Sequence, residues 1–228
     1  MYQTSLGSTT LPGQVCYGET NVSTTVRIHS RQQVGLNLTA EFDNGITVRL
    51  GRAQGKISID SASLDGLVGV LSQAGFASVG DALSVTDKSA SFTGAGISYD
   101  HENFVGSAEF TKRKTASYIS STTGWSVTGG YRLGRFTPYA VVSRLKVDRS
   151  NVNDTIPAGV PQLAPLRAGV EGLLAGQNIA QKTDSLGVRW DAYKNVAVKA
   201  QWDHVKPDSG PGLFERVPAG FGTSTVNV

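Results

Sequence analysis

Apolar and polar residues alternate one by one along much of this chain. Apolar side chains occupy every second position from Val34 to Phe42, and the pattern resumes from Ile46 to Leu50. Successive side chains of a β-strand point to opposite faces, so a period of two predicts strands with one apolar face. The intervening Asp43-Asn44-Gly45 is a strong hairpin signal. We therefore expect a β-hairpin over residues 34–50.

The same pattern predicts further hairpins along the chain. Their tight turns are expected at 100–103, 134–135 and 193–195. Longer connections separate the hairpins, at 57–87, 114–121, 149–182 and 206–222. Short turns at one end and long loops at the other are typical of an up-and-down outer-membrane barrel, whereas a sandwich would mix loop lengths at both ends. The strands are expected to have about 9–12 residues, close to the ~9–11 that cross a bilayer at a tilt.

Two of the long connections carry apolar residues at helical spacing. They cover Ser63–Leu83 and Gln162–Gln181, and both are expected to be partly helical. Two interpretations remain open. The segments form short helices that pack against the rim or wall of the sheet, or one of them folds inward and narrows a pore.

One face of the predicted strands is rich in charge. By strand parity it carries Glu41, Arg49, Glu109, Arg113, Arg132, Arg144, Lys146, Arg189, Asp191, Lys199 and Asp203. An unpaired ion buried in a dry core costs several kcal/mol, so this face is expected to meet water. The apolar face must then meet a second sheet or lipid. A water-filled barrel satisfies both faces at once, with the charged residues lining its lumen.

A few residues depart from this alternation. Phe92 and Val142 occupy strand positions assigned to the polar face, and the alternation does not explain Val142. Arg52 and Lys112 occupy strand positions assigned to the apolar face. Together with Lys114 they lie near long loops, where they can reach lipid phosphates.

Aromatic residues gather near the ends of the predicted strands. Those beside the tight turns are Tyr99, Phe104, Tyr131, Phe136, Tyr139, Trp190 and Tyr193. Trp125 and Trp202 lie toward the opposite ends of their strands. Two such belts are typical of the two interfaces of a membrane.

Composition narrows the remaining classes. Apolar residues make up 39% of the 228 residues, and no apolar run approaches the ~18 residues of a membrane helix. The net charge of +3 is not gathered into a basic run, so no nucleic-acid partner is expected. A single cysteine, Cys16, excludes an intrachain disulfide and a cysteine zinc cluster. His29, His101 and His204 are isolated, so neither a metal nor another cofactor is expected.

Three stretches carry a resemblance to a known family: SFTGAGISYDHENFVGSAEFTKRK, TTGWSVTGGYRLGRFTPYA and DSLGVRWDAYKNVAVKAQWDHVKP. They resemble strands of Gram-negative outer-membrane porins. The resemblance runs from about Gln33 to the end, and it is strongest over 89–148 and 184–207. It implies a barrel of about sixteen strands, often a homotrimer, that passes small hydrophilic solutes through the bacterial outer membrane in contact with its lipid and lipopolysaccharide.

The chain departs from the porin pattern in two respects. Its final TSTVNV lacks the terminal aromatic residue, usually Phe, that ends the last strand in this family. Only about nine or ten strands can be counted, and no signal peptide is visible. Residues 1–228 are therefore expected to form a single porin-like domain that is incomplete at both ends. The family's third-loop constriction would lie in the missing N-terminal part.

The leading hypothesis is an outer-membrane porin without enzymatic activity. The basic members of the charged face outnumber the acidic ones, which predicts a mild preference for anions. Arg132, Arg144, Arg189 and Lys199 are the candidate basic wall. Alternatively, these side chains only solvate the wall and pair with Glu109, Asp191 and Asp203.

Two other classes of function stay open. A soluble β-sandwich binding module would be folded and monomeric without detergent. An outer-membrane barrel enzyme such as a lipase would need a Ser–His pair formed across strands, although no Gly-x-Ser-x-Gly motif is present.

Overall fold

The structure is a computed structural model. It describes residues 9–17, 20–148, 155–208, 210, 212–213 and 226–227, with the backbone alone for 9–17, 20–26 and 226–227. The predicted connection at 206–222 and the closing stretch at 223–228 lie largely outside these residues.

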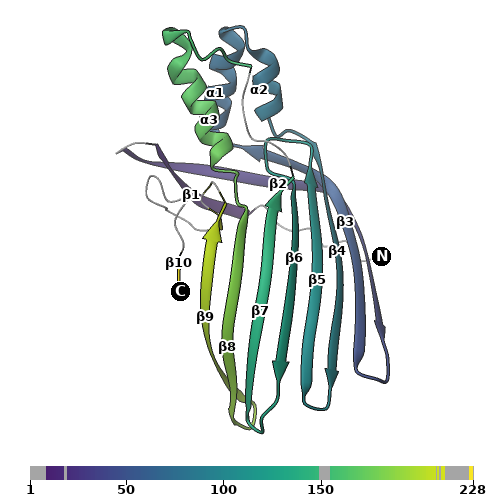
Figure 1. Cartoon of the computed structure of the whole chain (residues 1–228). Coiled ribbons are helices and arrows are strands. Elements are labelled where there is room, and N and C mark those ends of the chain that lie inside the picture. Colours follow the sequence, from purple (N-terminus) through teal and green to yellow (C-terminus); the bar gives the residue numbers. More distant parts are fainter. Residues whose placement is uncertain are drawn as a thin grey trace.

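Within the described residues, ten antiparallel strands form one sheet in which each strand pairs with its neighbours in the sequence (Figure 1). They are β1 (Thr9–Tyr17), β2 (Thr20–Glu41), β3 (Ile46–Asp60), β4 (Lys88–His101), β5 (Phe104–Thr115), β6 (Thr122–Tyr131), β7 (Phe136–Val147), β8 (Gln181–Tyr193), β9 (Val196–Pro207) and β10 (Val226–Asn227). The predicted all-β, antiparallel, up-and-down architecture is confirmed.

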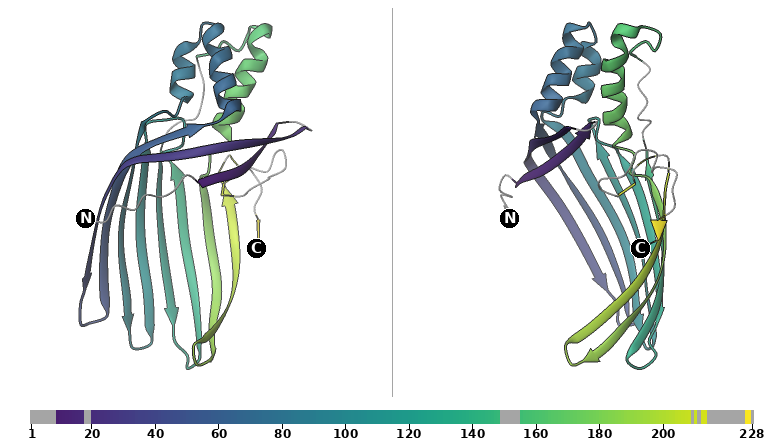
Figure 2. Two further views of the ribbon diagram at one scale, coloured as in Figure 1. Left: turned by 180° about the vertical axis from the view of Figure 1, so that it is seen from behind. Right: turned by 90° about the vertical axis from the view of Figure 1, so that its left-hand side faces the viewer.

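The sheet is curved and open. Its order runs from β1 to β10, and these two strands do not pair with each other in the part of the chain that the structure describes. Strand β2 contains an irregularity between Arg31 and Val34, where Gln32 has a φ of 52°. Figure 2 shows β1 and the first part of β2 crossing the end of the sheet beside the helices. The described strands therefore form a curved wall that is not closed into a barrel.

The tight turns lie together at the end of the sheet away from the helices (Figure 1). Between β2 and β3, the Phe42 N–H donates to the Ile46 carbonyl at 2.9 Å, and Gly45 has a φ of 80°. A Cβ atom on Gly45 would also overlap the Asp100 carbonyl, so only glycine fits this position. The tight turns predicted from the sequence are confirmed.

The helices form a small cluster of their own beyond the opposite end of the sheet (Figures 1 and 2). They are α1 (Ala62–Gln73), α2 (Ala77–Leu83), the 3₁₀-helix η1 (Pro161–Leu163) and α3 (Ala164–Ala175). The buried side chains of their shared core are Leu64, Leu71, Val79, Leu83, Ile156 and Val170. Both predicted helical segments are confirmed, and they pack on each other. Within the described residues, no helix combines the length and apolarity needed to cross a membrane.

The loop between β5 and β6 joins this cluster to the sheet. Tyr118 packs against the helix core, and its burial raises the pKa of the phenol. The Ser120 hydroxyl donates to the Gln177 carbonyl, just after α3, at 2.6 Å. The helices are therefore held to the strand ends by packing and by hydrogen bonds.

Truncation of Leu71 tests whether the helix cluster has its own core. Leu71 is 0% exposed, whereas the neighbouring Val70 is 53% exposed. Leu71→Ala is expected to weaken the cluster by about 2–5 kcal/mol, because it leaves a cavity among the helices. The measurement is native-state hydrogen exchange of the α1 and α3 amides. Val70→Ala is the control and should leave exchange nearly unchanged; equal effects would contradict a buried role for Leu71.

Candidate functional site

Strand register divides the sheet into two faces of opposite character. Leu38 pairs with Leu50 and Ala95 with Phe110, and further pairs continue this row from β2 to β6. Paired residues lie side by side on one face. Register and alternation place the following on this apolar face: Val34, Leu36, Leu38, Ala40, Ile46, Val48, Leu50, Ala95, Ile97, Tyr99, Phe104, Ala108, Phe110, Trp125, Val127, Tyr131, Phe136, Ala140, Val142, Leu186, Val188, Trp190, Val196, Val198, Ala200 and Trp202.

Exposure on the two faces is the reverse of that in a soluble protein. Leu36 is 78% and Leu186 60% exposed on the apolar face. On β6 and β7 the intervening side chains of the polar face are less accessible, and on β8 Ser185 is only 6% exposed. Side chains crowd together on the concave side of a curved sheet and spread apart on the convex side. The apolar face is therefore the convex, outer face, and the polar face is the inner one.

The polar face gathers most of the charged residues predicted to share it. Register places on it Glu41, Arg49, Glu109, Arg113, Arg132, Arg189, Asp191, Lys199 and Asp203. Gly35, Gly51, Gly94, Gly96 and Gly187 share this face, so much of it carries no side chain. The result is a polar, small-residue surface with charged side chains standing on it.

Two of the predicted basic residues are paired on this face. Arg132 donates to the Asp100 carboxylate at 2.7 Å and to the Glu102 carbonyl at 3.0 Å. Arg189 donates through two nitrogens to Asp191, at 2.9 and 2.7 Å. The predicted pairing with Asp191 is thus present. Asp100 was not predicted as a partner of Arg132, because it lies at the end of β4 and meets Arg132 only across the sheet.

Two predicted members of this face are placed wrongly by the parity rule. Register pairs Arg144 with Trp125 and Lys146 with Thr123, so both lie on the apolar face. The Arg144 guanidinium stands 6.0 Å from the centre of the Trp125 ring and 2.9 Å from Asp184.

The correction follows from the turn. Leu133 and Phe136 exchange backbone hydrogen bonds of 2.7 and 3.1 Å across a two-residue loop. Residues i and i+3 therefore lie opposite each other, and apolar positions change from odd to even numbers across the turn. The change also accounts for Val142, which belongs to the apolar face, and moves Tyr139 to the polar one.

Arg113 occupies a covered corner of the polar face. Its guanidinium donates to the Ser120 carbonyl at 3.0 Å, beneath the loop between β5 and β6. Its Nε is buried and has no hydrogen-bond partner in the described region. Arg113 therefore braces the loop as well as sharing the charged face.

On the polar face, the side chain of Tyr139 on β7 extends over β8 and reaches β9. Its hydroxyl lies 2.7 Å from the Gln201 side-chain oxygen, and its ring lies over Gly187 of the intervening strand. The Lys199 ammonium is 5.8 Å from the centre of the same ring. The Gln201 amide in turn donates to Asp203 at 2.7 Å. These contacts fix a polar network across β7, β8 and β9.

Metal-site geometry is absent from the described residues, which contain no group of three His, Cys, Asp or Glu side chains close enough to hold an ion. His29 lies 3.1 Å from Asp60 as an isolated pair.

Comparisons with known proteins do not change this description. No protein-family model, curated protein or solved structure matches the chain.

Substitution of Gly187 tests the Tyr139 network. A Cβ atom at Gly187 would overlap the Tyr139 ring, so Gly187→Ala is expected to displace the ring and cost about 1–3 kcal/mol. The measurement is the free energy of unfolding by urea in detergent micelles. Gly129→Ala is the matched control, because a Cβ atom there meets nothing within 4 Å. Equal stabilities of the two variants would contradict the assigned packing.

Proposed function

We propose that this chain is part of an outer-membrane β-barrel channel for small hydrophilic solutes. In this proposal the convex apolar face contacts lipid, and the concave polar face lines a water-filled path. The observation that carries it is the reversed exposure of the two faces. Large exposed apolar patches mark surfaces that meet a partner or a membrane, and no described element covers this one.

The dimensions of the apolar face support a bilayer as its partner. On β6 it extends from Trp125 to Tyr131, a length of about 20 Å at the rise of a β-strand. At the roughly 35–45° tilt of barrel strands this covers about 15 Å of height, more than half of the roughly 25 Å apolar band of outer-membrane barrels. Because the band continues from β2 to β9, a single small protein partner would cover only part of it.

Aromatic pairs mark both edges of the band. Near the tight turns, Phe104 and Tyr131 meet edge to face at 4.9 Å, and Phe136 stacks on Trp190 at 5.9 Å. Toward the helices, Phe110 pairs with Trp125. Rings at both edges of an apolar band are characteristic of the two membrane interfaces.

The open sheet requires more strands to close. The edge strands β1 and β10 leave backbone groups that cannot stay unpaired in lipid. A complete barrel of about sixteen strands would supply the partners, in agreement with the resemblance of these strands to porins.

The corrected register weakens the expected preference for anions. Arg144 and Lys146 leave the polar face, and Asp100 joins it beside Arg132. Arg132 and Arg189 are neutralised by ion pairs, whereas Arg49, Arg113 and Lys199 form none with any described residue. Arg113 is held beneath the loop between β5 and β6, which leaves Arg49 and Lys199 as the open cations. Selectivity is therefore proposed to be weak and to depend on these two cations.

Site-directed labels test the lipid contact. In a Cys16→Ser background, a fluorophore on Val127→Cys is expected to be quenched strongly by brominated lipids in vesicles. Thr128→Cys is the matched control on the next residue, which faces the polar side, and should be quenched weakly. Equal weak quenching, with a chain that stays monomeric without detergent, would favour the soluble binding module instead.

Charge reversal tests the channel and its wall. We expect Lys199→Glu to shift the reversal potential of the full-length gene product toward cation preference, because it reverses an unpaired charge on the polar face. Planar-bilayer recording under a salt gradient is the measurement. Lys146→Glu makes the same charge change on the opposite face and should leave the potential unchanged. Equal shifts would contradict the assignment of faces, and absence of conductance would contradict the channel.

A further inference from the structure

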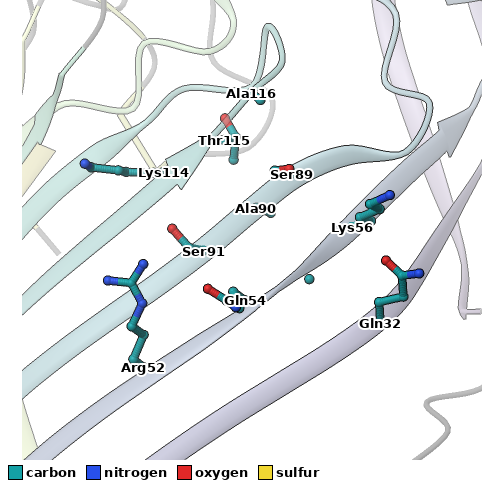
Figure 3. A pocket seen from close by; sticks show the side chains of 11 residues that line it. Gln32, Arg52, Gln54, Lys56, Ser89, Ala90, Ser91, Lys114, Thr115 and Ala116 are labelled. Carbon is teal, nitrogen blue, oxygen red and sulfur yellow. The ribbon is translucent and has the colours of Figure 1, made fainter.

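A shallow trough lies at the helix end of the apolar face, along β4 (Figure 3). Its floor is formed by the short side chains of Ser89 and Ser91. Register places Gln54 and Lys114 on either side of Ser91, on β3 and β5. Long side chains on the flanking strands β3 and β5, and short ones on β4 between them, leave an open pocket of about 540 Å³.

The trough is strongly basic. Arg52, Lys56 and Lys114 line it, and no acidic residue does so among the described residues. None of these three cations takes part in an ion pair within the described part of the chain. Figure 3 shows them on the two strands that flank Ser89 and Ser91. Arg144, on the same face, differs because Asp184 neutralises it.

The trough continues into the apolar band. Register places Ala95, farther along β4, between Leu50 and Phe110, so a small residue again lies between two large ones. Leu50 and Phe110 are both exposed. A ligand that lies along β4 therefore meets cations and hydroxyls at one end and apolar side chains at the other.

We propose that this trough binds the phosphate headgroup of an anionic lipid, with its acyl chains along Ala95 between Leu50 and Phe110. Arg52, Lys56 and Lys114 contact the phosphate oxygens through charge-assisted hydrogen bonds, and Ser89 and Ser91 offer hydroxyl donors. A phosphomonoester carries about −1.5 to −2 charges and so complements this cationic cluster. The inference rests on the proposed membrane location of the apolar face.

Lipid binding to the full chain in detergent micelles tests this site. Native mass spectrometry would measure the dissociation constant of dioleoyl phosphatidic acid against dioleoyl phosphatidylcholine. Phosphatidic acid is expected to bind more tightly than phosphatidylcholine. The double variant Arg52→Gln with Lys114→Gln is expected to lower the affinity for phosphatidic acid at least about tenfold, because charge-assisted contacts are lost. The charge-conserving Arg52→Lys with Lys114→Arg should retain binding, which separates loss of the site from loss of the fold.

A matched double variant separates the trough from general attraction at the membrane edge. Lys182 and Lys206 are paired on the same face of β8 and β9, outside the trough. Lys182→Gln with Lys206→Gln removes equal charge and should leave the affinity for phosphatidic acid within about twofold. An equal loss in both double variants would overturn the assignment to this trough.

The source of the phosphate is tested by competition. Inorganic phosphate at a large excess over phosphatidic acid should not displace it, because it lacks the acyl chains. Full displacement would show a free-anion site and overturn the lipid assignment, and equal binding of phosphatidylcholine would overturn recognition of the charge. Failure of this site would leave strong quenching at Val127→Cys intact, whereas failure of the membrane proposal would abolish that quenching.

Discussion

The exposed apolar face of the sheet is the constraint on which the rest of this structure depends. Burial of apolar surface contributes roughly 25 cal/mol per Å², so a band that continues from β2 to β9 represents a large unmet driving force. The described chain buries little of it, because its compact apolar core lies among the helices instead. In the proposed outer-membrane location, a bilayer would supply an apolar environment along the whole convex surface.

The polar face follows from the same curvature. Glycine and serine on the concave side let the strands bend without collision, and they leave space that water can fill. Tyr139 shows how closely this surface is fitted, because its ring reaches Gln201 only across the bare backbone of Gly187. Ion pairs such as Arg132–Asp100 then hold charges at the surface, where solvent reduces the cost of keeping them ionised.

The two ends of the sheet differ in construction for a physical reason. At the tight-turn end, two- and three-residue loops fix the register of each hairpin, and Gly45 is confined to glycine by both its φ and the Asp100 carbonyl. At the other end the connections are long enough to form helices with their own core. Basic side chains collect on the outer face at this end, and the small residues of β4 leave the trough open between them.

Much of the architecture could be predicted from alternation alone. The strands from Val34 onward, the tight turns and the two helical segments follow from local patterns, because period, turn chemistry and helical spacing are properties of neighbouring residues. Strand β1 and the first part of β2 were not predicted. Most of the charged face was also predictable, including Arg49, Glu109 and Lys199, since each lies in a strand whose parity is unambiguous.

From Val34 onward, the sequence by itself determined which segments are strands and that each has one apolar face. Only the tertiary structure decided how those faces join across β7, where Val141 and Val142 make the alternation ambiguous. The two-residue turn after Leu133 reverses the parity there and carries Arg144 and Lys146 to the outer face. Pairings across strands, such as Arg132 with Asp100, were likewise decided by register, because contacts between distant residues depend on how strands align and not on their local pattern.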